Sequence, residues 1–399
     1  MELKPPRYRR RSSRWPRVIF LLIALLVGLR LSGADEIAFQ AVYTRYLGPY
    51  VMDIVQSFGI DVTQLPEPLQ PTPTPTRSAP SWLAEAETAY WEGDLARASH
   101  AYAKAFELEP DNYKALVWQA QLEALRGHVA RAEELARKAV ELAPEDPLAL
   151  AVLGMALDWN GKPDEGISYA LKAVDIDPNF AEAHAYLAEI YADKGNWTRA
   201  LEEAQSAIAL DDRSVVAWRN MGYVLEMQGR YEEAIEAYQR ASELHPRLSY
   251  IYIGAGRNYL ALEQYDKAIE QFQKAIEASP NNADGYDALG WTYFLQGDPE
   301  RAIIELEKAV EVDPQFAPAH AHLGVVYYVR RYYEKAIEYF LKAIELGIEN
   351  EEYFYELGLS YVYLDQCEEG IPWLERALEL NPNSGPALEG LRLCAEAGL

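Results

Sequence analysis

The sequence is short of cysteine, of histidine and of positive charge. Two cysteines and 6 histidines in 399 residues exclude a cysteine-rich metal framework. Asp and Glu number 62 against 37 Lys and Arg, for a formal net charge of −25. Residues 1–78 hold 10 basic and 6 acidic side chains, which leaves 27 basic and 56 acidic ones for residues 79–399. Such an acidic region repels polyanions, so we expect no nucleic-acid partner.

The sequence also lacks the short motifs on which most enzyme predictions rest. It has no glycine-rich phosphate loop, no nucleophile elbow and no His-Glu-x-x-His pattern. His320 and His322 are two residues apart, so on a helix they point to different faces and make a poor metal pair. We therefore predict a protein that is not an enzyme and that has no cofactor and no metal site.

Long hydrophobic runs are absent except for one near the N-terminus. Seven basic residues precede an uncharged apolar run from Val18 to Leu29, and Asp35 and Glu36 follow. An extension to Ala34 covers about 25 Å as a helix, against roughly 30 Å of hydrocarbon. Positive charge before the run holds that end inside. We predict a basic cytoplasmic tail over 1–17 and a single transmembrane signal anchor over 18–34.

A cleaved signal peptide that ends at Ala34 is the alternative to the anchor, because small residues precede that point. In either case the rest of the chain is expected to be extracytoplasmic, and the anchor makes it a single-pass membrane protein. Residues 35–65 have apolar side chains at helical spacing, which predicts an amphipathic helical segment. Its role stays open between membrane contact, contact with the following domain and self-association. Residues 66–80 form a Pro/Thr-rich linker that favours extended polyproline geometry.

A unit of 34 residues repeats nine times over residues 79–384. Prolines recur at spacings of 34 or 68, at residues 110, 144, 178, 246, 280, 314 and 382. With residue 79 as position 1, positions 8 and 20 are Ala or Gly in every unit. Small residues let two antiparallel helices approach closely. Position 27 is Ala throughout: Ala105, Ala139, Ala173, Ala207, Ala241, Ala275, Ala309, Ala343 and Ala377.

This pattern resembles the tetratricopeptide repeat (TPR) family, and the resemblance covers residues 79–399. It implies an all-α fold, a right-handed superhelical solenoid of nine helical hairpins, with the transmembrane helix before it. Residues 385–399 match the start of a tenth unit and are expected to form a capping helix, which an open-ended solenoid needs. The resemblance further implies a concave groove lined by the first helices, and a protein or peptide partner. It leaves the oligomeric state open.

The candidate binding site is the groove face of the first helices. Positions 2, 5, 9, 12 and 13 point away from the packed face of each first helix. Aromatic residues gather there, and they suit stacking on peptide side chains, prolines or sugar rings. Two arginines at these positions could capture a carboxylate. The candidates at these positions are Trp91, Trp159, Arg219, Tyr223, Tyr250, Arg257, Trp291, Phe294, Tyr328, Tyr355 and Tyr363, and Trp118 joins them from the neighbouring position 6. Packing between repeats, or contact across the groove, is the alternative role for some of them.

The two cysteines lie at the C-terminal end of the repeats. Cys367 begins the second helix of repeat nine and Cys394 lies in the cap, where antiparallel neighbours bring the two positions together. We expect either a disulfide that holds the cap, which an exported domain permits, or two buried free thiols. Two functions follow from the sequence. The first is a membrane-anchored, extracytoplasmic scaffold that binds a protein or peptide, for example in assembly of an envelope complex. The alternative is a carbohydrate-handling accessory factor whose groove aromatics bind a secreted glycan.

Overall fold

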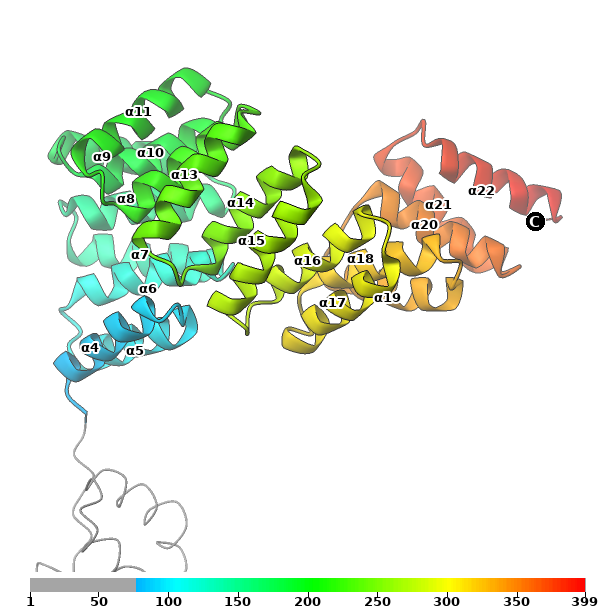
Figure 1. The fold of residues 1–399 in the computed structure, drawn as a ribbon, viewed down its shortest axis with the longest axis horizontal. Helices are drawn as coiled ribbons and strands as arrows, with labels where there is room; N and C mark the ends of the chain where they lie inside the picture. The colour runs from blue at the N-terminus through cyan, green and yellow to red at the C-terminus, as the bar shows by residue number, and fades with distance from the viewer. Residues whose placement is uncertain (1–76, 399) are drawn as a thin grey trace, which may run out of the picture. The chain divides into compact units, whose positions relative to one another are not determined.

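The computed structural model describes residues 77–398 (Figure 1). Over that range the chain forms nineteen α-helices and no β-strand. The predicted cytoplasmic tail (1–17), signal anchor (18–34) and amphipathic segment (35–65) lie outside the described residues, as does the linker up to residue 76. No helix within residues 77–398 is both long and apolar enough to span a bilayer. Ala79 and Pro80, which the sequence placed at the end of the linker, lie in the first turn of a helix, where proline is tolerated.

Eighteen of the helices form nine consecutive hairpins, and the last helix stands alone at the end of the solenoid. Each hairpin pairs a first helix of 13 residues with a second helix of 13 or 14. The pairs are α4 (Ala79–Trp91) with α5 (Leu95–Leu108), α6 (Tyr113–Leu125) with α7 (Val129–Leu142), α8 (Pro147–Trp159) with α9 (Pro163–Ile176), α10 (Ala181–Asp193) with α11 (Trp197–Leu210), α12 (Val215–Met227) with α13 (Tyr231–Leu244), α14 (Ser249–Ala261) with α15 (Tyr265–Ala278), α16 (Ala283–Leu295) with α17 (Pro299–Val312), α18 (Ala317–Val329) with α19 (Tyr333–Glu345), and α20 (Glu351–Tyr363) with α21 (Cys367–Leu380); α22 (Gly385–Glu396) follows them.

The small residues of the repeat lie where the helices of a hairpin touch. The alanines of position 27 are 0–1% exposed in every repeat. The turn between the two helices needs a left-handed residue at position 15, which is Gly in six of the nine repeats. In the sixth, eighth and ninth repeats Glu263, Arg331 and Asp365 adopt the same positive φ, of 56 to 62°. The geometry of the turn is therefore kept where the glycine is missing.

The first helices of the early repeats pack directly against one another. α8 is buried all round over ten consecutive residues, from Ala149 to Asp158, and it contacts both α6 and α10. The close approach depends on small side chains at the groove positions 5 and 12, where Ala151, Ala185 and Ala192 are 0% exposed. In the later repeats position 12 carries larger side chains, such as Phe294 and Tyr328, and the first helices touch one another less.

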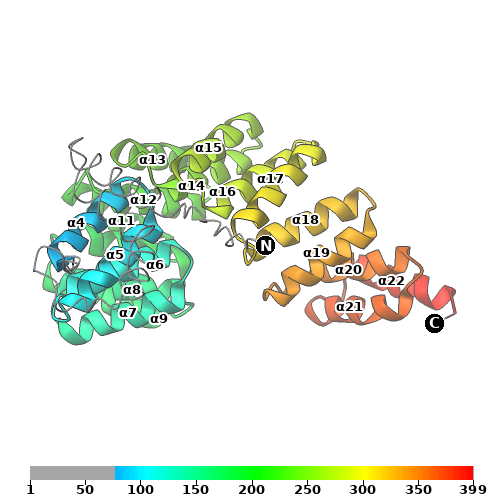
Figure 2. The same cartoon turned by 90° about the horizontal axis from the view of Figure 1, so that it is seen from below.

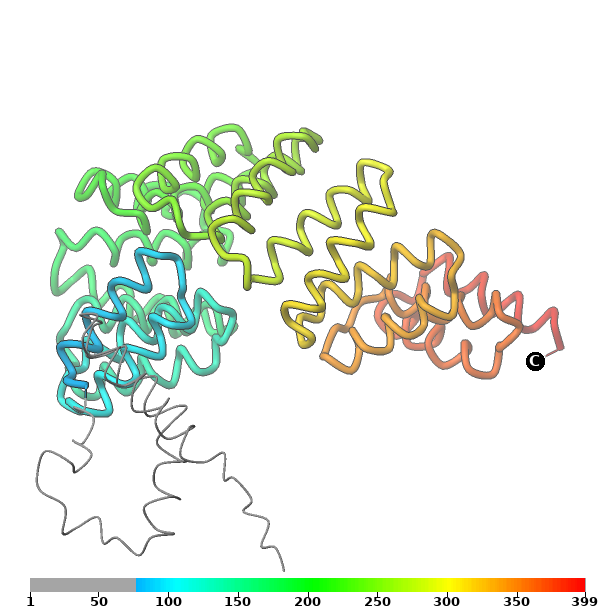
Figure 3. The backbone as a smooth tube through the Cα atoms, turned by 60° about the horizontal axis from the view of Figure 1, so that its bottom comes forward, coloured from blue at the N-terminus to red at the C-terminus, as the bar shows by residue number. Residues whose placement is uncertain are grey.

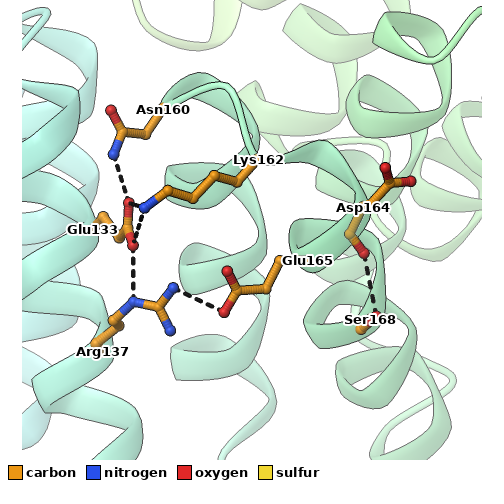
Figure 4. A network of polar contacts seen from close by, with 7 residues as sticks. All are labelled: Glu133, Arg137, Asn160, Lys162, Asp164, Glu165 and Ser168. Carbon is orange, nitrogen blue, oxygen red and sulfur yellow. Dashed lines mark hydrogen bonds and ion pairs between the residues drawn. The ribbon is translucent and has the colours of Figure 1, made fainter.

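Second helices and turns of neighbouring early repeats are also joined by a polar network (Figure 4). Glu133 on α7 accepts hydrogen bonds from Nζ of Lys162, at 2.7 and 2.8 Å, and from Nε of Arg137, at 2.8 Å. Arg137 also donates to Glu165 of the next repeat. Burial of Glu133 raises its pKa, but the bonds from Lys162, Asn160 and Arg137 outweigh burial and hold the pKa at about 2. This carboxylate fixes the third repeat on the second.

The first hairpin contacts the segment that joins the fifth and sixth repeats. The indole of Trp91 stacks on the ring of His245, with centroids 4.5 Å apart and planes 3° apart. Tyr90 meets the same ring edge-on at 4.8 Å. A Cβ atom on Gly93 would lie 2.1 Å from the carbonyl oxygen of Arg247, so only glycine fits there. Repeats one to five thus close into a turn, which Figures 2 and 3 follow from blue α4 to green α13.

The C-terminal end of the solenoid is held by a disulfide. Cys367, at the start of α21, is bonded to Cys394 in α22, and their Cα atoms are 5.6 Å apart. Both cysteines are buried in a cluster with Phe354, Leu374 and Ala387. α22 packs against α20 and α21 and covers the last hairpin, while its exposed side carries the ion pairs of Arg392.

Candidate functional site

The twelve predicted groove residues form two groups along the chain. The early group comes from the first to sixth repeats and ends at Tyr250, and the late group begins at Arg257 in the sixth repeat. Only four of them are exposed, namely Trp91, Trp118, Arg257 and Tyr363, and the other eight are half-buried. The early group surrounds the closed turn: Trp91, Trp118, Trp159, Arg219, Tyr223 and Tyr250. The late group lies on α14 to α20: Arg257, Trp291, Phe294, Tyr328, Tyr355 and Tyr363.

Three side chains of the early group, Trp159, Arg219 and Tyr223, are joined in a cluster around Glu189. This carboxylate is 3% exposed and accepts a hydrogen bond from Trp159 Nε1 at 3.1 Å. It also forms a salt bridge with Arg219. The Arg219 guanidinium lies over the rings of Trp159 and Tyr223, at 5.3 and 5.5 Å from their centroids. Tyr223 in turn donates its hydroxyl to Asp193. The predicted carboxylate-capturing arginine is therefore already paired inside the chain.

Tyrosines at the centre of the closed turn complete this cluster. Burial raises the pKa values of Tyr186 and Tyr250 above the ordinary value of a phenol. Tyr186 accepts a hydrogen bond of 2.7 Å from Gln121 of the second repeat. The sequence did not single out Gln121, Tyr186 or Glu189, although Gln121 and Glu189 occupy the groove position 9. The alanines at positions 5 and 12 were the available signal that the first helices pack too closely to leave an open groove.

One carboxyl group of the early cluster has no hydrogen-bond partner. Asp158 is 6% exposed, and both of its oxygens are buried and unbonded among the residues that the structure describes. Burial first, and then the neighbouring Asp193 carboxylate, raises the pKa of Asp158 well above its usual range.

Two residues of the late group, Arg257 and Trp291, line a cavity of about 420 Å³ between α14, α16 and α18. Trp291 lines it and stacks on His322, with ring centroids 4.3 Å apart. His322 Nδ1 lies 2.7 Å from an oxygen of Asp287, which fixes the ring orientation. Arg257 contacts both oxygens of Asp284, at 3.1 and 3.3 Å, with 56% of its side chain exposed. Both predicted groove arginines are thus paired, Arg219 in the interior and Arg257 at the surface.

An exposed apolar row runs along the ends of the three late first helices. Leu295, Val329 and Tyr363 occupy position 13 in successive repeats and are 45%, 57% and 47% exposed. Phe294 packs on Trp291 at 5.1 Å. Tyr333 contacts both Tyr328 and Tyr363, with ring centroids 6.1 and 5.0 Å away. The aromatic members of this surface were predicted from the sequence, but Leu295 and Val329 were not, because only aromatic side chains were taken as candidates.

The remaining residue of the late group, Tyr355, lies on α20 together with the buried carboxyl group of Glu356. Tyr355 is half-buried, and burial raises its pKa to about 12, with Glu352 and Glu356 as the next causes. Glu356 is 5% exposed, and its Oε2 atom has no hydrogen-bond partner among residues 77–398. Burial and the Glu352 charge raise the pKa of Glu356 to about 8. The late first helices therefore carry aromatic rings together with a buried carboxyl group, that of Glu356, which forms no salt bridge among the described residues.

The arrangement suits binding and offers no nucleophile–base pair of the kind that covalent catalysis needs. No group of three or more His, Cys, Asp or Glu side chains within residues 77–398 is placed to hold a metal ion. His320 and His322 are occupied separately, since His320 Nε2 lies 3.1 Å from the Pro314 carbonyl oxygen. What the late first helices present is the cavity lined by Trp291 and His322, together with the exposed side chains of Leu295, Val329 and Tyr363.

Family models described as tetratricopeptide repeat match most of the solenoid. They cover residues 83–147, 179–315, 288–351 and 351–384. Residues 148–178 fall outside these matches, yet they form the hairpin of α8 and α9 like the others. No curated protein matches the chain significantly.

Solved structures with the same fold include three large repeat proteins. The Cut9–Hcn1 hetero-tetramer of the APC/C is 18% identical, with a TM-score of 0.61 over 84% of this chain and 66% of that chain. Yeast Tom70 is 14% identical, with a TM-score of 0.51 over 81% and 89% of the two chains. The human IFIT1 dimer with m7Gppp-AAAA is 20% identical, with a TM-score of 0.52 over 86% and 79%. At these identities the likeness is one of fold.

Proposed function

The chain belongs to the tetratricopeptide repeat family, and from that premise we propose that it binds a protein or peptide partner along the groove of its seventh to ninth repeats. A helical-repeat scaffold of this family is typical of protein–protein interaction. The observation that carries the proposal is the apolar row of Leu295, Val329 and Tyr363. These side chains hold no internal position that the fold needs, and exposed contiguous apolar surface marks interaction sites.

The early residues Trp159, Arg219 and Tyr223 do not support the proposal, because their polar groups already have hydrogen-bond or salt-bridge partners within the chain. A ligand there would have to break the Glu189–Arg219 salt bridge, which lies in the interior. Trp159→Ala would therefore act through the fold and not through a lost partner contact. Trp291, which lines the late cavity, is the tryptophan whose loss reports on binding.

We further propose that the repeats are held outside the cytoplasm by the segment over 18–34. The basic residues before that segment support this orientation. A disulfide between Cys367 and Cys394 supports it as well, since disulfides persist in oxidising compartments. A scaffold at that place suits the assembly of a complex in the cell envelope. Non-reducing peptide mapping of the exported protein that finds only free thiols would contradict this location.

The test is chemical cross-linking of the full-length chain in intact cells, followed by mass spectrometry of the partners. Val329→Ala with Tyr363→Ala is expected to abolish the main adduct, because both side chains lie in the groove. The matched control is Ile304→Ala on α17, which removes an apolar side chain that is 62% exposed outside the groove. An adduct that survives the double change equally well counts against the groove.

A glycan ligand is the outcome that would replace this proposal. Titration of soluble oligosaccharides against the full-length chain, followed by tryptophan fluorescence, separates the two. A saturable change that Trp291→Ala abolishes would favour sugar stacking on the exposed part of that ring. We expect no such change, because His322 covers one face of Trp291 and half of the stacking surface is taken.

A further inference from the structure

The cavity between the first helices of the sixth, seventh and eighth repeats has a lining of two kinds. Its volume of about 420 Å³ lies within the range of ligand sites, about 300–1,000 Å³. Leu260, Trp291 and Phe316 are among the residues of an apolar wall. Asp284 and Asp287 also line it, and they are three residues apart on α16, so they lie on one side of that helix. The cavity therefore joins an apolar wall to a pair of carboxylates.

Both carboxylates keep acceptor capacity that the fold does not use. Asp287 is 5% exposed, and its Oδ1 atom lies 2.7 Å from His322 Nδ1, whereas its Oδ2 atom accepts no hydrogen bond from a described residue. This Oδ2 atom is not among the unpartnered atoms that the fold seals from solvent. Asp284 has 29% of its side chain exposed and meets one cation, Arg257, at 3.1 and 3.3 Å. Each carboxylate can accept up to about four hydrogen bonds, so donors from a ligand can be added at both.

The charges that line the cavity are mainly negative. Among the described residues of the lining, Arg257 is the one permanent cation, against the carboxylates of Asp284 and Asp287. Burial raises the pKa of Asp284, and although Arg257 opposes this rise, the charge of Asp287 adds to it. The repeat region as a whole has the same sign, with 56 acidic and 27 basic residues over 79–399. A ligand group of positive charge is therefore favoured electrostatically.

We propose that this cavity seats a lysine or arginine side chain of the bound peptide, with its charged end at Asp284 and Asp287. The methylene stem would lie along the apolar wall, as such stems do when the charged end stays in a polar environment. An apolar side chain would instead bury the two carboxylates without a new hydrogen bond, and an anionic one would be repelled by both. This seat rests on the proposed peptide-binding function and defines one residue of the ligand.

The cavity adjoins the exposed apolar row of the proposed binding surface. Leu295 follows Trp291 by four residues on α16, or about 6 Å along the helix, which an extended peptide spans in about two residues. Val329 follows His322 by seven residues on α18, or about 10 Å, which takes about three residues. The partner segment is therefore expected to carry an apolar residue about two or three positions from its lysine or arginine.

The first experiment is photo-cross-linking in intact cells with the full-length chain that carries Pro318→p-benzoylphenylalanine. Pro318 lines the cavity, is exposed and lies in the first turn of α18. Sequencing of the adduct by mass spectrometry is expected to give a partner segment with a lysine or arginine within about three residues of the cross-link. A segment without a basic residue overturns the cation seat and leaves the proposed function standing.

The adduct at Pro318 is compared with the adduct that depends on Val329 and Tyr363. If the second forms and the first does not, the cavity is overturned as a seat and the proposed function stands. If neither forms, both are overturned.

The second experiment measures the affinity of the cross-linked segment, made as a synthetic peptide, for the full-length protein. Replacing its lysine by norleucine keeps the stem and removes the charge, and it is expected to weaken binding at least about tenfold, the effect of a lost charge-assisted hydrogen bond. Citrulline serves in the same way for an arginine. Equal or tighter binding of the norleucine peptide would show an apolar seat and overturn the proposal.

Asp287→Asn tests the protein side of the same contact. It is expected to weaken binding of the lysine peptide about as much as norleucine does, and to change binding of the norleucine peptide little, because both changes remove one interaction. The matched control is Asp175→Asn, which neutralises an exposed carboxylate on α9 and is expected to leave the affinity unchanged. Equal losses in the two variants would assign the effect to overall charge and overturn the seat. Thermal unfolding of Asp287→Asn checks its fold, and the norleucine comparison on the unchanged protein decides the question if that variant does not fold.

Discussion

The early and late repeats use the same 34-residue unit but treat their groove residues in opposite ways. Over α4 to α13 the side chains of Trp159, Arg219 and Tyr223 bond to partners within the chain, and the first hairpin closes on the fifth and sixth repeats. Over α14 to α20 the side chains of Arg257 and Trp291 line a cavity, and Leu295, Val329 and Tyr363 form an exposed apolar row. The difference teaches that an aromatic residue at a groove position is a binding candidate only when the neighbouring first helices leave room for a ligand.

The largest expected effect contrasts the two groove arginines. Arg219→Ala leaves Glu189 buried without its cation and is expected to lower the free energy of unfolding by about 3–5 kcal/mol. Arg257→Ala breaks an ion pair at the surface and is expected to cost less than about 1 kcal/mol. Denaturant titration of both variants measures the difference. Equal losses of unfolding free energy in the two variants would show that the salt bridge of Arg219 is no more buried than that of Arg257.

The next effect tests the other end of the solenoid. Cys367→Ser with Cys394→Ser opens a loop of 27 residues and is expected to destabilise the cap by about 3 kcal/mol. Because repeats contact mainly their neighbours, the loss should stay in α20 to α22 and leave the closed early turn intact. Hydrogen exchange resolves the two regions. Faster exchange in α4 to α13 would contradict the independence of the halves.

A matched pair of glycine substitutions tests the closure itself. Gly93 and Gly127 share φ = +82° at the same repeat position, so alanine is strained equally at both. A Cβ at Gly127 meets open space, whereas at Gly93 it meets the Arg247 carbonyl. Gly93→Ala is therefore expected to cost about 1–3 kcal/mol more than Gly127→Ala and to expose α4 and α5. Hydrogen exchange of those helices checks it, and equal behaviour would argue against the closed turn.

The smallest effect is a pH dependence of the same contact. Burial lowers the pKa of His245 below its unfolded value of about 6.5. The unfolded chain therefore binds the proton first, so the contact is fully stable above about pH 6.5 and weakens as the pH falls through that value. We expect a loss of at most about 1–2 kcal/mol by pH 5, seen as lower protection factors in α4.

His245→Phe keeps an aromatic ring under Trp91 without a titrating group and serves as the control. Its α4 protection is expected to be unchanged between pH 7 and pH 5. Local exchange is the right measure, because a hydrogen bond to Glu203 raises the pKa of His184 and stabilises α10 as the pH falls. An equal loss of protection in His245→Phe would assign the effect to other groups.

Much of the fold follows from residue type at fixed spacing. Ala at position 27 and a small residue at position 8 specify hairpin packing through local contacts, and the turn residue at position 15 needs only its own φ. The candidate site followed only in part. Trp291 lines a cavity and Tyr363 is exposed, but Trp159 and Tyr223 were selected by the same rule and form internal hydrogen bonds. Repeat position predicts the direction in which a side chain points, but it does not predict how closely the neighbouring helices pack against it.

The sequence by itself determined the repeat, its period, its helical hairpins and the acidic character of the solenoid, because each depends on contacts within one or two units. Only the tertiary structure decided which groove residues remain available to a partner. That outcome depends on contacts between different repeats, such as those of Trp159 with Glu189 and of Trp91 with His245. Contacts of this kind are not visible in any single unit, and for this reason Trp159 and Tyr363, both at position 13, looked alike until the chain was folded.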